Sequence, residues 1–273
     1  MQFFATILTV FLLQQAYSPA EFTQVAGASL RARYDAALAQ GQRGSDETFW
    51  IAYRFPVRPG IRIATWDGNT TITQTTSTDG IEWIPDSTEV QRVGVFLLTG
   101  KADGVVQRTR LINLNQNFRV HDRKVYWLGE PSADDSLSLL DRLIKDSPQK
   151  FASQFTHYMS LHDSTRVAEH LLELTKSPAN SNEVRRAAIT YLGREVSRQA
   201  GVELDRLVSD PNTDIQRQAV AAISRRANDE SIPSLIRIAK ENPNASVRAY
   251  AIQLLGQKQD PRVIAFFETL LKK

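Results

Sequence analysis

The second half of the chain repeats one pattern of apolar positions. In four successive segments, apolar or small side chains stand at the first, fifth and ninth positions of a predicted helix, which places them on one helix face. These positions are Phe151, Phe155 and Met159; Val184, Ala188 and Leu192; Ile215, Ala219 and Ile223; and Val247, Ala251 and Leu255. The pattern predicts helices that are built on a common plan.

A second helix is predicted in each segment, about twenty residues after the first apolar anchor. Its apolar positions are Leu171 and Leu174, Leu204 and Leu207, Leu235 and Ile238, and Phe266 and Leu270. Proline-containing pairs such as Asp210-Pro211 and Asn242-Pro243 separate the segments, because proline ends one helix and can open the next. Two helices alone cannot bury both of their faces. Residues 136–273 are therefore predicted to form an α-solenoid of about four stacked helix pairs.

The first half of the chain has β-type patterns after one short helix, which is expected at Ser29–Gln40. Aromatic and β-branched runs bounded by turn residues predict several short strands, and Asp67-Gly68 and Asp79-Gly80 favour hairpin turns. Strands are expected at 49–55, 61–66, 70–76 and 81–84, and hairpins are expected to pair 92–98 with 105–114 and 118–120 with 124–128. The expected fold class is α+β multidomain, with an antiparallel β-rich domain of unknown family at 21–135 before the solenoid.

The first twenty residues have the pattern of a secretory signal peptide. An apolar run at Phe3–Leu13 is followed by the small-residue stretch Ser18-Pro19-Ala20, which predicts cleavage after Ala20. The run is shorter than the roughly 20 residues that span a bilayer, although an N-terminal helix buried in the fold is the alternative interpretation. The chain has no cysteine, which fits an exported protein of the bacterial periplasm or exterior better than a disulfide-rich extracellular protein.

Several of the repeated segments carry a family resemblance. Val184–Ile189 with Leu192-Gly193, and Val247–Ile252 with Leu254–Gly256, resemble the HEAT-repeat signature of bacterial proteins, of the kind also found in phycobilisome lyases. Asp260–Val263 is similar to the usual turn between the two helices of such a repeat. The whole layout resembles exported bacterial HEAT-repeat proteins. The resemblance implies a solenoid over about 147–273, from which the segment that begins at Phe151 departs most.

The composition and the motifs do not favour an enzyme. The chain has 273 residues, 42% of them hydrophobic, and a net charge of +3, an excess too small to indicate a nucleic-acid-binding protein. Without cysteine there is no thiol nucleophile, and no phosphate-binding glycine loop or zinc-protease motif occurs. Ser147–Lys150 has the Ser-x-x-Lys spacing of penicillin-binding enzymes but lacks the accompanying Lys-Thr-Gly. We therefore expect no catalytic residue and no cofactor.

The four histidines are His121, His157, His162 and His170. The last three lie close together in sequence, near Asp163 and Glu169, so a metal site is conceivable. None is four residues from another on a helix, however, and none is repeated in the other segments. We therefore expect packed or solvated histidines and no bound metal.

Arginines at repeated positions are the main candidates for partner binding. Arg206 and Arg237 occupy equivalent places on successive second helices, away from the leucine face, where they are expected to engage an acidic partner or to remain a solvated face. Another repeated set lies near the start of the first helices: Arg185, Arg217 and Arg248. These arginines are expected to form ion pairs between repeats, with Asp210, Asp214 or Glu183 as partners.

The last predicted helix has two apolar stripes. Val263, Phe266 and Leu270 are expected to pack within their own repeat. The second stripe, Ile264, Phe267 and Leu271, has no later repeat to cover it, so it is expected to contact a partner or a second copy of the chain. The alternative is a tilt of the helix that buries both stripes.

Taken together, the patterns favour a non-enzymatic, protein-binding scaffold of the bacterial cell envelope that engages a protein or peptide along the solenoid. Two alternatives stay open at this point. One is a lyase-type enzyme, by analogy with the phycobilisome lyases alone, and the other is a purely structural assembly module.

Overall fold

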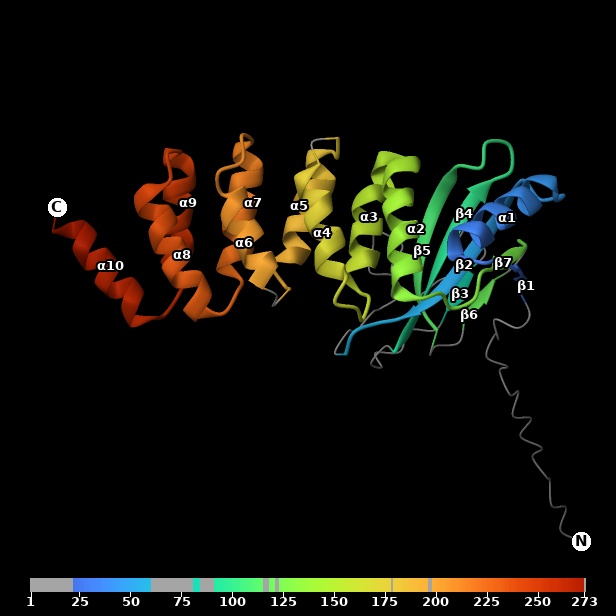
Figure 1. Ribbon diagram of the computed structural model, residues 1–273, viewed down its shortest axis with the longest axis horizontal. Coiled ribbons are helices and arrows are strands. Elements are labelled where there is room, and N and C mark those ends of the chain that lie inside the picture. Colours follow the sequence, from blue (N-terminus) through green and yellow to red (C-terminus); the bar gives the residue numbers. More distant parts are fainter. Residues whose placement is uncertain are drawn as a thin grey trace, which may run out of the picture. The chain divides into compact units, whose positions relative to one another are not determined.

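The computed structural model describes residues 22–59, 81–83, 91–114, 118–120, 123–177, 179–195 and 198–272 (Figure 1). The expected signal peptide at 1–20, the expected strands at 61–66 and 70–76 with their two Asp-Gly turns, and His121 lie outside these residues. The chain forms two compact units. Among the described residues, the first unit holds 22–27, 33–54 and those between 81 and 129, and the second holds 28–32, 55–59 and 130–272. The expected domain boundary at 135 stays a prediction.

The first unit contains a five-stranded sheet with the strand order β1-β7-β2-β4-β5. Its strands are β1 (Thr23–Gln24), β2 (Thr48–Pro56), β4 (Arg92–Gly100), β5 (Val106–Asn113) and β7 (Val125–Trp127). A separate antiparallel pair consists of β3 (Ile81–Trp83) and β6 (Phe118–Val120). The expected N-terminal helix is present as α1 (Leu30–Arg43), and the expected hairpin of 92–98 with 105–114 is confirmed as β4 and β5.

The sheet is mixed, whereas we expected purely antiparallel strands. β7 runs parallel to both of its neighbours, pairing Tyr126 with Thr23 of β1 and Val125 with Trp50 of β2. The expected hairpin of 118–120 with 124–128 is therefore wrong, because β6 pairs with β3 instead. Turn residues predict pairing only between strands that are adjacent in sequence, whereas β7 is inserted between two distant strands. All three of its side chains are buried, as is typical of an internal parallel strand.

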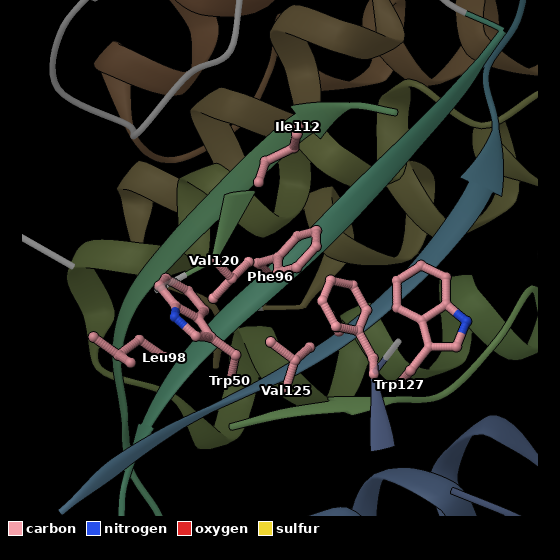
Figure 2. Close-up of a cluster of buried hydrophobic side chains, with 9 residues drawn as sticks. Trp50, Phe96, Leu98, Ile112, Val120, Val125 and Trp127 are labelled. Atoms are coloured by element: carbon pink, nitrogen blue, oxygen red, sulfur yellow. The ribbon is translucent and has the colours of Figure 1, made fainter. Parts of the chain in front are cut away.

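The core of the first unit lies on both faces of this sheet. On one face, alternate residues of the central strands gather the largest rings, with Trp50 and Phe22 each 6.2 Å from Phe96 between ring centroids, in edge-on contacts. Figure 2 shows this cluster, which consists of Phe22, Trp50, Ala52, Phe96, Leu98, Ile112, Val120, Val125 and Trp127. On the other face, α1 lies close to β2, because a Cβ atom on Gly41 would stand 2.2 Å from the ring of Phe49. Glycine is required at that position.

The second unit is the predicted α-solenoid (Figure 1). After α2 (Ala133–Asp146), the first helices of the repeats are α3 (Gln149–Ser160), α5 (Asn182–Leu192), α7 (Thr213–Ser224) and α9 (Ala245–Leu255). The second helices are α4 (Val167–Lys176), α6 (Arg198–Leu207), α8 (Asn228–Glu241) and α10 (Pro261–Leu271). The first helices pack on one another in the order α3, α5, α7 and α9, and each of them also packs on a second helix. The helix pairs therefore stack in sequence order.

The repeated apolar positions form the core of the solenoid. All twelve of the anchors expected on the first helices are buried, as are Leu171, Leu174, Leu204, Leu207, Leu235, Ile238 and Phe266 on the second helices. Leu270 is the exception at 41% exposed, which corrects the expectation that it packs within its own repeat. It lies in the last turn of α10, where no further second helix follows among the described residues.

Polar side chains close the turns between repeats. Before α7, the carboxylate of Asp210 accepts the N–H of Asn212, and before α9 the side-chain oxygen of Asn242 accepts the N–H of Asn244, both at 2.9 Å. Asn242 is buried and also donates to the carbonyl of Val208 in the preceding repeat, at 3.1 Å. The Asp-Pro and Asn-Pro pairs of the sequence thus supply both a helix boundary and a link between repeats.

Replacing Leu204 with aspartate should destabilise the solenoid. Leu204 is fully buried on α6, so an unpaired carboxylate there should cost about 3–5 kcal/mol, and the loss should spread because neighbouring repeats stabilise one another. We expect a lower melting temperature and reduced helical circular dichroism.

Val202→Asp is the matched control for Leu204→Asp. Val202 lies on the same helix but is 64% exposed, so its change should leave the melting curve almost unaltered. Equal melting temperatures for the two variants would contradict the assignment of the buried face of α6.

Candidate functional site

A groove lies between two successive second helices, α4 and α6. It has a volume of about 640 Å³ and is lined by Glu169, Leu172, Glu173 and Lys176 of α4, and by Gln199, Val202 and Glu203 of α6. On each helix these positions follow a spacing of three and four residues, so they form one stripe per helix. The groove is therefore a surface of the helical repeat itself and needs no irregular loop to form it.

The floor of the groove holds a buried carboxylate. Glu203 is 6% exposed, and Arg206 donates to both of its oxygens, from Nη2 at 2.5 Å and from Nε at 2.9 Å. The hydroxyl of Thr175 on α4 lies 3.3 Å from Oε1 of Glu203 and 2.8 Å from the carbonyl oxygen of Leu172, which it can also reach as a donor. The hydrogen bond with Glu203 raises the pKa of the Arg206 guanidinium. This bidentate pair fixes both side chains.

The rim of the groove carries two further carboxylates, which are exposed. Glu169 accepts from Nε of Arg166 at 2.7 Å, and Glu173 accepts from Nζ of Lys176 at 3.1 Å. All four side chains in these pairs are about half or more exposed, and Glu173 reaches 75%. Such surface ion pairs contribute only about 0–1 kcal/mol, so water or another cation can replace either partner at little cost.

The two arginines that we expected to engage an acidic partner both lie on second helices and are about half exposed. Each already pairs with a carboxylate of this chain. Arg206 binds Glu203 within α6, and Arg237 on α8 donates to Oδ1 of Asp205 on α6 at 2.7 Å. Their role in partner binding stays a prediction.

Sequence reasoning missed the groove residues. Leu172, Val202 and Glu203 belong to no motif, and each helix taken alone gives no sign that α4 and α6 face one groove. One signal was available, because Val202 interrupts an otherwise polar stripe of α6. An apolar residue on the solvated stripe of a repeat helix marks a candidate contact position.

The arginines near the start of the first helices connect repeats as expected, but by different means. Arg185 forms the expected ion pair with Asp210, with Nη2 2.5 Å from Oδ2. The guanidinium of Arg217 instead lies 4.6 Å from the ring centroid of Tyr250, and Arg248 donates to the carbonyl of Asn242 at 2.7 Å. Among the contacts that the structure describes for these three arginines, only the contact of Arg185 with Asp210 is an ion pair. The expected ladder of ion pairs is thus reduced to that one pair.

The histidines are packed into the solenoid. The Nδ1 atom of His162 lies 3.1 and 3.2 Å from the carbonyl oxygens of Tyr158 and Met159, so it carries the proton, and Nε2 accepts from the hydroxyl of Ser136 at 2.7 Å. The ring of Phe55 stacks on His162 with 3.6 Å between centroids. Burial lowers the pKa of His162 to about 4, so the ring is neutral at physiological pH.

The other two described histidines have separate partners. His157 stacks on Tyr191, and burial, together with the positive charges of Arg194 and Arg58, lowers its pKa to about 4. Nδ1 of His170 lies 2.5 Å from a carboxylate oxygen of Asp141. Within the described ranges, no group of three or more histidine and carboxylate side chains is arranged to hold a metal ion.

The second stripe of α10 is largely uncovered. Ile264 is 63% and Leu271 88% exposed, and Phe267 is partly buried beside Phe266, with 5.5 Å between ring centroids. Only the first stripe is packed, through Val263 and Phe266. The helix therefore does not bury both stripes in this structure. That the exposed stripe contacts a partner or a second copy stays a prediction.

None of the helices in the part of the chain that the structure describes has the length and hydrophobicity needed to cross a membrane.

One comparison with known families agrees with the helical repeats of the second unit. A family model described as HEAT repeats matches residues 202–273, and no curated protein matches the chain. A solved structure of computationally designed armadillo repeat proteins for modular peptide recognition is similar at 20% identity, with a TM-score of 0.30. That match covers 45% of this chain and 64% of the designed chain, so this chain spans less than two thirds of its length. Residues 202–273 are therefore similar to HEAT repeats.

Acid should destabilise the solenoid through its buried histidines. In the folded protein the pKa of His162 lies near 4, whereas in the unfolded chain it returns to its ordinary value of 6.5. The unfolded state therefore binds more protons as the pH falls from 6.5 toward 4, and stability is lost over that window. We expect His162 alone to contribute a loss of about 2 kcal/mol between pH 7.5 and pH 5.

Urea unfolding at the two pH values measures this loss, and His162→Gln serves as the comparison. Glutamine can donate to the same carbonyls and accept from Ser136 but does not titrate. The free energy of unfolding of the variant should therefore depend less on pH than that of the original protein. An identical pH dependence in the variant would show that His162 does not carry the effect.

The two stripes of α10 should respond differently to a positive charge. Val263→Lys places an ammonium group at a buried position and should lower the melting temperature by several degrees. Ile264→Lys changes the neighbouring, exposed position and should leave the melting temperature nearly unchanged. A large loss of stability in Ile264→Lys would mean that α10 buries both stripes after all.

Proposed function

We propose that this protein is a non-enzymatic, protein-binding scaffold of the bacterial cell envelope. In this proposal, a segment of a partner protein lies along the second helices of the solenoid. The groove between α4 and α6 is the observation that carries the proposal. It combines an exposed apolar side chain, Val202, with charged side chains at its rim, the mixture that interfaces between proteins use.

The architecture of the second unit supports the same function. Stacked helix pairs repeat one surface at regular intervals, and such arrays bind extended partners along that surface. The residues that could have served chemistry are engaged in structural contacts instead. His162 is stacked and hydrogen-bonded, and Arg206 is held by Glu203. A surface whose polar side chains are already engaged in such contacts suits binding better than acid–base catalysis.

Export to the envelope rests on the sequence of residues 1–20. The apolar run at Phe3–Leu13 and the small residues before Glu21 have the order of a signal peptide. The absence of cysteine fits a bacterial envelope. A scaffold in that compartment would meet other exported proteins or the exposed parts of membrane proteins.

A photo-crosslinking amino acid placed at Val202 tests the binding function in cells. If a partner lies in the groove, irradiation should yield a discrete crosslinked band, and the same amino acid at Val105, which is exposed in the first unit, should yield none. Crosslinking at neither position, or equally at both, would contradict binding along the second helices.

In the same cells, the protein should be periplasmic with Glu21 as its first residue. Cytoplasmic protein with Met1 intact would contradict export.

A further inference from the structure

We propose that the groove between α4 and α6 binds a short basic peptide segment. An apolar side chain of the segment lies between Leu172 and Val202, and an adjacent lysine or arginine pairs with Glu173 and Glu169. The inference rests on the proposed function and names the chemical class of the partner. It replaces the acidic partner that the repeated arginines suggested.

The apolar contact follows from the exposure of Val202. Its side chain is 64% exposed on the stripe of α6 that lines the groove, and Leu172 lies on the facing stripe of α4. The groove of about 640 Å³ has room for a side chain between them. Covering Val202 would remove apolar surface from water, which favours binding, whereas Leu172 is only 9% exposed and forms part of the apolar wall of the groove. A segment made only of charged residues would leave this part of the groove unfilled.

The charge of the partner follows from which ion pairs in the groove can be exchanged. Three carboxylates line it, against one lysine. The pair of Glu203 with Arg206 is bidentate and has a buried carboxylate, so separating it would leave a buried charge without compensation. Arg206 is therefore poorly placed to receive a carboxylate from outside.

The carboxylates at the rim are different. Glu173 is 75% exposed and holds Lys176 by one contact of 3.1 Å, and Glu169 holds Arg166 on the surface. A cation from a partner can replace Lys176 or Arg166 at almost no cost, because these pairs are solvated. An acidic segment would instead bring its carboxylates toward Glu169 and Glu173 and be repelled. The same repulsion disfavours the phosphates of a nucleic acid.

Selection of a random peptide library against the full chain tests the inference. The probe is the displayed library, selected on the original protein alone, so that no variant biases the charge of the retained peptides. We expect the retained peptides to be enriched in lysine or arginine next to an aliphatic or aromatic residue. A synthetic peptide from the enriched set should then bind more weakly as ionic strength rises, because screening weakens exposed charge pairs.

Two charge variants locate the binding of that peptide, and each has a matched control. Val202→Lys and Glu173→Lys should each weaken binding about tenfold or more, equivalent to about 1.4 kcal/mol. Val105→Lys and Glu241→Lys introduce the same changes at exposed positions outside the groove and should leave the affinity unchanged. Melting temperatures of all four variants should match the original protein, since none of these positions is buried.

The possible failures have separate meanings. Enrichment of acidic peptides, or of peptides without charge preference, would overturn the basic class of partner while leaving binding in the groove intact. Peptides that bind the original protein and Val202→Lys equally would overturn the groove as their site. If crosslinking at Val202 in cells still captures a discrete partner, the scaffold function stands and only the inference about a basic segment fails.

Discussion

The second unit depends on the close approach of its first helices. These helices pack on one another through small residues at the middle of each face, Ala188, Ala219 and Ala251, which are all completely buried. At the end of α5 the approach is close, because a Cβ atom on Gly193 would lie 2.9 Å from Cβ of Ala222 on α7. No helix pair can bury its apolar faces alone, so each repeat exists only because its neighbour covers it.

Polar contacts complement this apolar packing at the turns. In three of the repeats, one residue just after the first helix forms a hydrogen bond with an earlier part of the solenoid. This residue always stands three places after the last core position of that helix. His162 accepts from Ser136, Arg226 donates to the carbonyl of Glu195 at 2.7 Å, and Lys258 donates to Oδ1 of Asn228 at 3.0 Å. The chemistry differs at each step, although the position is constant. Packing therefore sets the repeat, and the polar contacts adapt to the residues available.

Local periodicity was sufficient to predict the helices, because a helix face needs only residues three and four apart. It was insufficient where distant segments meet. Phe55 stacks on His162, the N–H of Arg58 donates to the carbonyl of Leu161 at 3.1 Å, and its guanidinium lies 2.9 Å from Glu195. The segment 55–59 thus packs with helices about a hundred residues later in the sequence, and no local pattern identifies such partners. The parallel pairing of β7 could not be predicted for the same reason.

The groove shows why a repeated position does not imply a repeated role. Arg206 and Arg237 occupy equivalent places, but one pairs within its own helix and the other pairs with the preceding second helix. Glu203 lies three residues before Arg206 on the same helix, whereas Asp205 reaches Arg237 from the preceding second helix. Because Glu203 is buried, its charge requires Arg206 for compensation, so that arginine adds little positive potential to the surface. The exposed carboxylates Glu169 and Glu173, each held only by a solvated pair, then set the charge that a partner meets at this groove.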